Sequence, residues 1–159
     1  MHPFKQALAA AALVGIAFAV FSQTTPQRAT PAATAARAPA ADIGPSNVVQ
    51  AATEIAQLID GGQIAQVWDG SSPVSQRAIG RDKFVATITS QRKALGAPVS
   101  RHWTAVTRSV VQNEKTVPNG YYVSARFETR FAGNRVASEL FSFRFDEDGT
   151  WRLSGYTIN

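Results

Sequence analysis

Strict alternation of side-chain character over residues 121–131 is the feature that most limits how this chain can fold. Successive side chains of a β-strand point to opposite faces of the sheet, so a period of two predicts a strand with one buried face. The mostly apolar face would carry Tyr121, Val123, Ala125, Phe127, Thr129 and Phe131. The polar face would carry Tyr122, Ser124, Arg126, Glu128 and Arg130. We therefore expect a half-buried strand around which the rest of the domain is organised.

Two further strands are expected after it, each preceded by a turn. Gly133 and Asn134 tolerate φ > 0 and predict a hairpin turn. The Asp-Glu-Asp-Gly sequence of residues 146–149 predicts a second turn, before a last strand over residues 150–158. The strand between the turns would place on one face Ala137, Glu139, Phe141, Phe143 and Phe145. The C-terminal third thus predicts a meander with one aromatic face, which a single carboxylate, Glu139, interrupts.

Apolar residues spaced by three and four positions precede these strands and predict helices. The first helix would carry its stripe at Val48, Ala52, Ile55 and Ile59. Ser46 is its predicted N-cap, and Gly61 and Gly62 end it. Short helical segments follow over residues 63–68 and 72–79, and Ser72 is the predicted cap of the second. A last helix over residues 81–95 repeats the spacing at Phe84, Ile88, Gln91 and Leu95.

Residues 99–112 are rich in Val and Thr and predict the first long strand. Its alternation breaks between Trp103 and Val106, which predicts a bulge or a strand covered on both faces. Helices first and antiparallel strands afterwards are the order of an α+β domain. We expect N-terminal helices packed on a curved, four-stranded antiparallel sheet.

The N-terminal segment predicts export. An uncharged apolar run over residues 7–21 suits the core of a signal peptide, whereas a transmembrane helix needs about twenty residues. No strongly favoured cleavage site stands out, so an uncleaved membrane anchor stays an alternative. We assign residues 1–22 to a signal peptide or membrane anchor, 23–45 to a Pro- and Ala-rich disordered linker, and 46–159 to a single domain. The expected location is periplasmic or secreted, or at the inner membrane with residues 7–21 as the anchor.

Charge and motif content argue against several classes of function. The formal net charge is +5 and the sequence pI is about 10.1, but the basic residues are scattered, so we expect no nucleic-acid partner. The chain has 0 Cys, which excludes disulfides and thiolate metal sites. Apart from His2 in the leader, His102 is the only histidine, and no HExxH, GxSxG, GxGxxG or P-loop pattern occurs. We expect neither a bound metal nor a cofactor.

Glu139 is the residue with the clearest chemical potential, because a carboxylate on an apolar face is costly unless it is paired or hydrogen-bonded. Arg101 and Arg126 lie on predicted strands and are its candidate partners. Glu139 would then form a structural ion pair, recognise a polar ligand in a pocket, or act as an acid or base. The aromatic candidates to line such a pocket are Tyr121, Tyr156, Trp68 and Trp151.

A set of short motifs occurs in a fixed order between residues 60 and 156. They include Asp60-Gly61, Val67-Trp68-Asp69, Gln91-Arg92, Ser100-Arg101, Asn119-Gly120-Tyr121-Tyr122-Val123, Phe127-Glu128-Thr129-Arg130-Phe131, Glu139, Gly149-Thr150-Trp151-Arg152 and Gly155-Tyr156. This set resembles the bacterial domain-of-unknown-function family 4019. The resemblance implies an exported protein without an assigned activity. It also implies the cone-shaped, cystatin-like fold of the nuclear transport factor 2 superfamily, which hosts enzymes, ligand binders and dimerisation modules.

Three functions are compatible with these observations. The leading hypothesis is a non-enzymatic exported domain that binds a small ligand or an envelope protein in or on the sheet concavity. The second is a membrane-tethered periplasmic assembly module that forms a homodimer through the sheet. The third is an isomerase or dehydratase that uses Glu139 with a Tyr partner.

Overall fold

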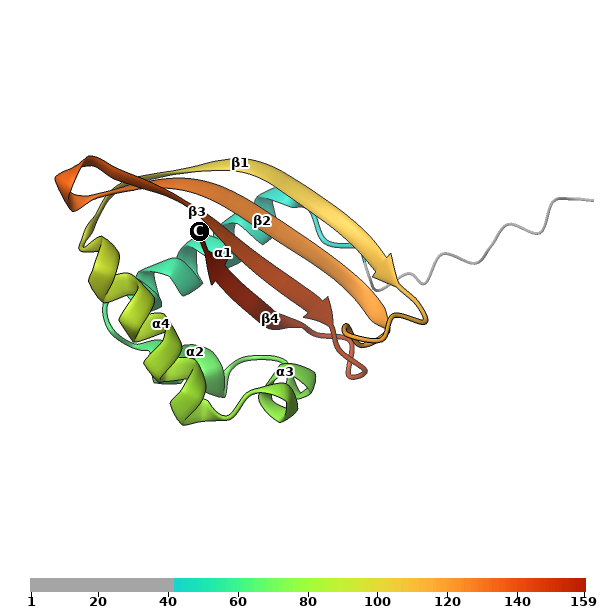
Figure 1. Cartoon of the computed structure of the whole chain (residues 1–159). Coiled ribbons are helices and arrows are strands. Elements are labelled where there is room, and N and C mark those ends of the chain that lie inside the picture. Colours follow the sequence, from blue (N-terminus) through green and yellow to red (C-terminus); the bar gives the residue numbers. More distant parts are fainter. Residues whose placement is uncertain (1–41) are drawn as a thin grey trace, which may run out of the picture. The chain divides into compact units, whose positions relative to one another are not determined.

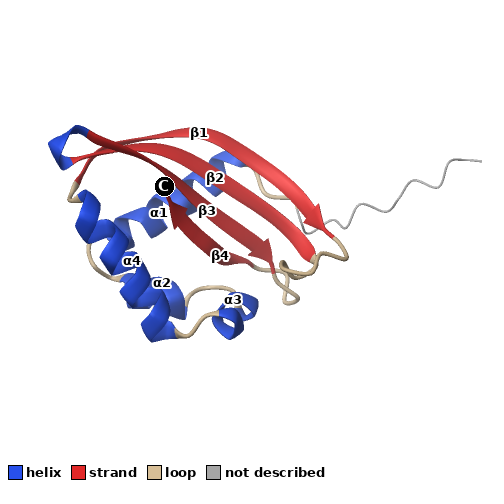
Figure 2. Cartoon of the chain, viewed as in Figure 1, coloured by secondary structure: helices blue, strands red, loops and turns tan. Residues whose placement is uncertain are grey.

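The computed structural model describes residues 42–159. The predicted signal peptide or anchor, and the predicted linker up to residue 41, lie outside the described residues. Helices come first, as α1 (Pro45–Asp60), α2 (Ile64–Asp69), α3 (Pro73–Ala78) and α4 (Arg81–Leu95). They are followed by β1 (Pro98–Val111), β2 (Gly120–Phe131), the 3₁₀ turn η1 (Ala132–Asn134), β3 (Arg135–Phe145) and β4 (Trp151–Ile158). The predicted α+β order is confirmed (Figure 2).

The strands form one antiparallel sheet in the order β1-β2-β3-β4, so the predicted meander is confirmed and β1 and β4 are its edges. Gly133 has φ 72° and Asn134 has φ 61°, which confirms the predicted hairpin turn. In Figure 1 this turn lies at one end of the sheet. The β1–β2 loop and the β3–β4 turn lie together at the other end.

Bulges interrupt the ladder at the edges of the sheet. On β1, Val99 and Thr104 have no partner in the register with β2, which confirms the bulge predicted from the broken alternation. On β4, Ser154 is the extra residue between the pairs that Leu153 and Gly155 make with β3. A bulge bends a strand and increases its twist, which helps the sheet to curve around the helices.

Helices α1, α2 and α4 cover one face of the sheet, where the core lies (Figure 1). Because side chains of β2 and β3 alternate, one face of these strands is buried as the sequence predicts. The core combines Val48, Ala52, Ala56 and Ile59 of α1, Ile64 and Val67 of α2, and Ile88 of α4 with Val123, Ala125, Phe127, Phe141, Phe143 and Leu153 of the sheet. A smaller cluster, formed by Phe131, Ala137 and Ile158, closes the end near η1.

Two sequence predictions about the helices are wrong. The N-cap of α1 is Gly44 and not Ser46, because Pro45 already occupies the first helical position. In α4, Gln91 is exposed, and the neighbouring Arg92 turns its side chain toward the sheet instead. The predicted cap of α3 is confirmed, since the Ser72 hydroxyl accepts a hydrogen bond from the backbone N–H of Val74.

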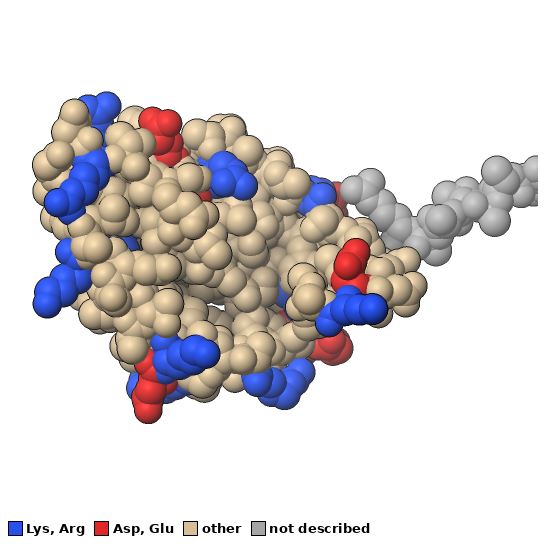
Figure 3. Space-filling view, viewed as in Figure 1, with Lys and Arg blue, Asp and Glu red and all other residues tan. Residues whose placement is uncertain are grey.

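Lys and Arg side chains are spread over the face shown in Figure 3, with Asp and Glu between them. Within residues 42–159, no helix is both long enough and apolar enough to span a bilayer.

Candidate functional site

Glu139 lies on the buried face of β3, where the alternation of that strand places it. Its Cα pairs with Phe127 on β2 and with Ile158 on β4, so apolar residues flank it on both neighbouring strands. The side chain is only 1% exposed. A carboxylate at such a position needs several donors to replace its lost hydration.

Four side chains supply those donors. Oε1 of Glu139 accepts hydrogen bonds from Arg92 Nη1 at 3.0 Å and from the Tyr156 hydroxyl at 2.7 Å. Oε2 accepts from Arg101 Nε at 2.7 Å and from the Thr129 hydroxyl. Both carboxylate oxygens are therefore saturated by groups from four different elements.

Asp60, the last residue of α1, joins the two arginines on their other side. It accepts from Arg92, and its Oδ2 lies 3.0 Å from Nη1 of Arg101. Two guanidinium groups thus face two carboxylates, and their formal charges cancel. We call this set the Glu139 network; its members are Asp60, Arg92, Arg101, Thr129, Glu139 and Tyr156.

The ionisation of the network follows from these contacts. Burial alone would raise the pKa of Glu139, but hydrogen bonds from Arg101, Thr129 and Tyr156 outweigh it and hold that pKa below its usual value. Burial and the nearby carboxylate of Glu139 raise the pKa of Tyr156 far above its usual value. Glu139 is therefore an ionised carboxylate and Tyr156 a neutral phenol at neutral pH.

This arrangement suits a structural cross-link better than catalysis. A general base needs a raised pKa and a lone pair within reach of a substrate. Glu139 has a lowered pKa, a buried side chain and four donors already on its oxygens. The geometry therefore argues against Glu139 as an acid or base.

The structure brings Arg101 and Tyr156 to Glu139, but it places the other candidates elsewhere. Arg126 lies on the opposite face of β2, where its Nη1 donates to the Ser138 hydroxyl at 3.1 Å, so it is not a partner of Glu139. Tyr121 is exposed near the start of β2, where it pairs with Val110 of β1, which is also exposed.

The two tryptophan candidates also lie apart from Glu139. Trp68 on α2 donates from Nε1 to the backbone oxygen of Ile79 at 3.0 Å, which ties α2 to the end of α3. Trp151 packs on Phe145 with ring centroids 5.3 Å apart. Its Nε1 is buried and has no hydrogen-bond partner among the described residues. Both tryptophans pack between neighbouring elements.

Sequence reasoning missed three members of the network: Asp60, Arg92 and Thr129. The alternation of β2 places Thr129 on the buried face, two positions from Phe127. Its hydroxyl could therefore have been recognised as a possible donor to Glu139. Arg92 gives no such signal, because it is adjacent to the predicted stripe and 47 residues from its partner.

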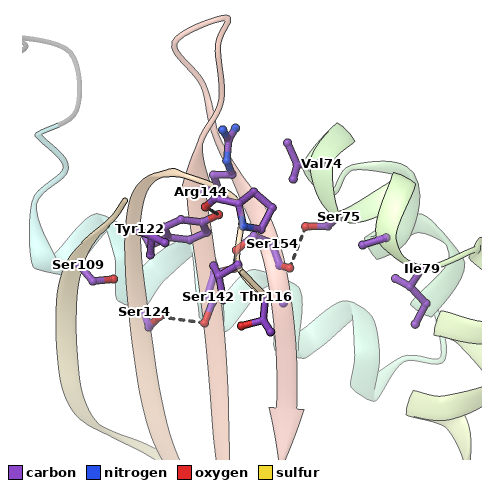
Figure 4. A pocket seen from close by; sticks show the side chains of 15 residues that line it. Val74, Ser75, Ile79, Ser109, Thr116, Tyr122, Ser124, Ser142, Arg144 and Ser154 are labelled. Atoms are coloured by element: carbon purple, nitrogen blue, oxygen red, sulfur yellow. Dashed lines mark hydrogen bonds between the residues drawn. The ribbon is translucent and has the colours of Figure 1, made fainter. Parts of the chain in front are cut away.

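A second feature lies on the face of the sheet opposite the core. Each strand contributes a serine there: Ser109, Ser124, Ser142 and Ser154 (Figure 4). Ser124 and Ser142 are paired across β2 and β3, and their hydroxyls are 2.9 Å apart. These small side chains leave the sheet surface low, and they form the floor of a pocket of about 520 Å³ that we call the serine pocket.

Apolar side chains form the walls of the serine pocket. Helix α3 contributes Val74 and Ile79 on the β4 side, and the loop between β1 and β2 contributes Val117 and Pro118. The serine at position 75 holds α3 against β4, because its hydroxyl donates to the backbone oxygen of Ser154 at 2.8 Å. The pocket is thus bounded by elements that the sheet itself positions.

Tyr122 and Arg144 form the end of the serine pocket next to the β1–β2 loop (Figure 4). The Tyr122 hydroxyl donates to the backbone oxygen of Pro118 at 2.7 Å, and Arg144 Nη2 donates to that of Asn119 at 3.1 Å. Both side chains therefore fasten the loop over the pocket. The sequence does not predict this pocket, because the predicted pocket residues are aromatic and Glu139 lies on the opposite face of the sheet.

No group of His, Cys, Asp and Glu suited to hold a metal ion occurs in the described part of the chain. Residues 51–156 match a protein family whose description is "Protein of unknown function (DUF4019)". This match spans more than half of the chain, so the chain belongs to that family. Among curated proteins, none matches the chain.

Proposed function

We propose that this protein is a non-enzymatic ligand-binding domain of the bacterial cell envelope and that its ligand binds in the serine pocket. The observation that carries the proposal is the composition of this pocket. Its volume of about 520 Å³ lies in the range of ligand sites, which are generally apolar with a few well-placed polar groups. Hydroxyl groups on the floor and apolar walls reproduce that combination.

Gly155 offers a direct way to block the site. It lies in the pocket lining, and a Cβ added there would meet no atom within 4 Å outside its two chain neighbours. Gly155→Leu should therefore fill the pocket without disturbing the sheet. Thr157→Leu is the matched control, because Thr157 is exposed on the same strand and does not line the pocket.

The test is a screen of small-molecule fragments against the full-length protein by NMR. We expect fragments that shift the amide signals of Ser142, Ser154 and Gly155, that bind the Thr157→Leu variant equally, and that no longer bind Gly155→Leu. If no fragment shifts these amides, or if Gly155→Leu binds as the wild type does, the serine pocket is not a ligand site.

The proposed envelope location rests on the apolar run over residues 7–21 and on the Pro- and Ala-rich segment after it. Cell fractionation distinguishes its two forms. Release with the soluble periplasm and a mature N-terminus near residue 20 would favour cleavage, and retention with the inner membrane would favour an anchor.

The order of helices and strands also supports a place in the nuclear transport factor 2 superfamily.

The β1 edge favours a second candidate, the membrane-tethered module that assembles with another copy of itself. Val99, Trp103 and Val110 of this edge strand are all exposed, and Trp103 is 58% exposed. An unpaired edge with exposed apolar residues is a template for pairing with another chain. If the protein is dimeric in analytical ultracentrifugation, Trp103→Ser should weaken the dimer; a monomeric wild-type protein would rule this candidate out.

A further inference from the structure

We infer that the serine pocket takes an uncharged molecule that donates hydrogen bonds, such as an amide or an alcohol, and that has one apolar side. This inference rests on the proposed function and narrows its ligand class. It follows from three properties of the pocket: the hydrogen bonds that its arginine already makes, the balance of charges around that arginine, and the hydrogen bonds of its hydroxyl groups.

The arginine at the end of the pocket has no free donor for an anion. Arg144 Nη1 donates to Asp146 Oδ1 at 2.9 Å and to Glu147 Oε2 at 3.2 Å. Nη2 donates to Glu147 Oε1 at 2.7 Å and to the backbone oxygen of Asn119 at 3.1 Å. A guanidinium has five N–H donors, so only the one on Nε is left.

That last donor is out of reach. Arg144 Nε is buried, without a partner among the described residues, and lies against Gly120, where even an added Cβ would come within 3.1 Å. A carboxylate or phosphate in the pocket would therefore have to displace Glu147 or Asp146 from the guanidinium. An anion gains little from a site whose cation is already paired.

The surroundings of Arg144 carry no excess charge. Arg152 donates to Asp146 Oδ2 at 3.1 Å and to Asp148 Oδ2 at 2.7 Å. The hydrogen bond from Arg144 lowers the pKa of Glu147, and the nearby charge of Arg77 adds to this effect. The groups that face one another are three arginines, Arg77, Arg144 and Arg152, and three carboxylates, Asp146, Glu147 and Asp148. The formal charges at this end of the pocket therefore cancel, and none is left over to attract an anion or a cation.

The hydroxyls of the pocket present mainly acceptors. Ser75 and Ser154 use their hydrogens on backbone oxygens, at 2.8 Å and 3.1 Å, and Tyr122 uses its hydrogen on Pro118. A hydroxyl has one donor and two acceptor positions, so each of these oxygens can still accept. Ser124 and Ser142 share a bond that consumes one of their two hydrogens. A ligand that donates hydrogen bonds can therefore use the oxygens of Ser75, Ser154 and Tyr122, whose own hydrogens are already committed.

The opposite walls require an apolar side of the ligand. Val74 and Ile79 from α3 and Val117 and Pro118 from the loop offer no side-chain donor or acceptor. A cation is disfavoured here for the same reason as an anion, because it would lose its hydration with no free carboxylate to replace it. Primary amides and alcohols on an apolar skeleton meet all of these conditions.

A set of probes with one skeleton tests the ligand class. We would titrate the full-length protein with cyclohexanecarboxamide, its N,N-dimethyl derivative, cyclohexanecarboxylate and cyclohexylmethylammonium, and follow the amide signals of Ser142, Ser154 and Gly155 by NMR. We expect the carboxamide to bind most tightly. The dimethyl derivative has lost its N–H donors and should bind about fivefold more weakly, and both ions should bind at least as weakly as this derivative.

Serine variants provide a second readout. Ser154→Ala should weaken binding of the carboxamide and leave binding of the dimethyl derivative unchanged, because only the first donates to this oxygen. Tighter binding of either ion, or equal binding of the two amides, would overturn the inference and leave the pocket a ligand site of another class. Failure of all four probes to shift these amides, together with an empty fragment screen, would overturn the proposed function as well.

Discussion

Nε of Arg101 lies 2.7 Å from Oε2 of Glu139, which links the edge strand β1 to β3 across the intervening β2. Arg101 also binds Asp60 at the end of α1, so the same side chain joins the helix layer to the sheet. Since Arg92 repeats this double contact from α4, the network joins both layers through the carboxylates of Glu139 and Asp60. Loss of the network should therefore lower the stability of the whole domain.

Glu139→Gln is expected to lower the free energy of unfolding by about 3 kcal/mol, because removing one partner of a buried ion pair leaves the other charges uncompensated. Urea denaturation followed by tryptophan fluorescence measures the change. Glu128→Gln is the control, since Glu128 is exposed on the neighbouring strand and should change stability by less than about 0.5 kcal/mol. Equal effects of the two substitutions would contradict a structural role for the network.

The network should also make stability depend on acid pH. The pKa of Glu139 in the folded protein lies below its ordinary value of 4.5, so the unfolded chain takes up the proton first as the pH falls. The stabilisation from Glu139 is thus complete well above pH 4.5 and is lost below it, as the pH falls toward and through the folded pKa. We expect the stability difference between wild type and Glu139→Gln to shrink over this range. A difference that stays constant down to about pH 3 would mean that folding does not lower the pKa of Glu139.

Tyr156→Phe removes one donor from Glu139 and should cost about 1–2 kcal/mol. Tyrosinate absorbance gives an independent readout, since the raised pKa keeps Tyr156 protonated in the folded protein. At about pH 11, the folded wild type and Tyr156→Phe should show the same absorbance. After unfolding in denaturant at that pH, the wild type should gain the signal of one more tyrosinate. A difference between the folded proteins would show that Tyr156 ionises normally.

The strands and the order of the fold could be predicted from local patterns, because alternation on β2 and β3 records which side chains are buried. Glu139 could be singled out for the same reason, since a carboxylate on an apolar face contradicts its surroundings. Arg101 and Arg126 were both candidate partners, although the alternation over residues 121–131 already places Arg126 on the polar face. The pairing of His102 with Glu128 places Arg101 on the core face, whereas Arg126 belongs to the opposite face.

What escaped prediction depends on contacts between distant segments. Arg92 and Asp60 meet only because α1 and α4 both end beside β1, and no local pattern of either helix records this. The serine pocket depends on where α3 and the β1–β2 loop lie, and small hydroxyl residues on a polar strand face give no signal of a pocket. Local periodicity identifies the buried face of a strand. It does not predict which helices and loops come together over the exposed face.

The cap of α3 allows a last test, in which a correct and an incorrect sequence prediction serve as variant and control. Ser72 is fully buried, accepts from the N–H of Val74 and donates to Asp146 Oδ1 at 2.6 Å, so it fixes the start of α3 and joins it to the β3–β4 turn. Ser72→Ala should cost about 1–2 kcal/mol, as loss of an N-cap does, and the carboxylate of Asp146 loses a donor.

Ser46→Ala is the control, because Ser46 is exposed and does not cap α1, and it should change stability by less than about 0.5 kcal/mol. Since α3 forms one wall of the serine pocket, Ser72→Ala should also increase hydrogen exchange at the amides of α3 more than at those of α1. Equal stability of the two variants, with unchanged exchange in α3, would show that the contact with Asp146 does not hold this wall in place.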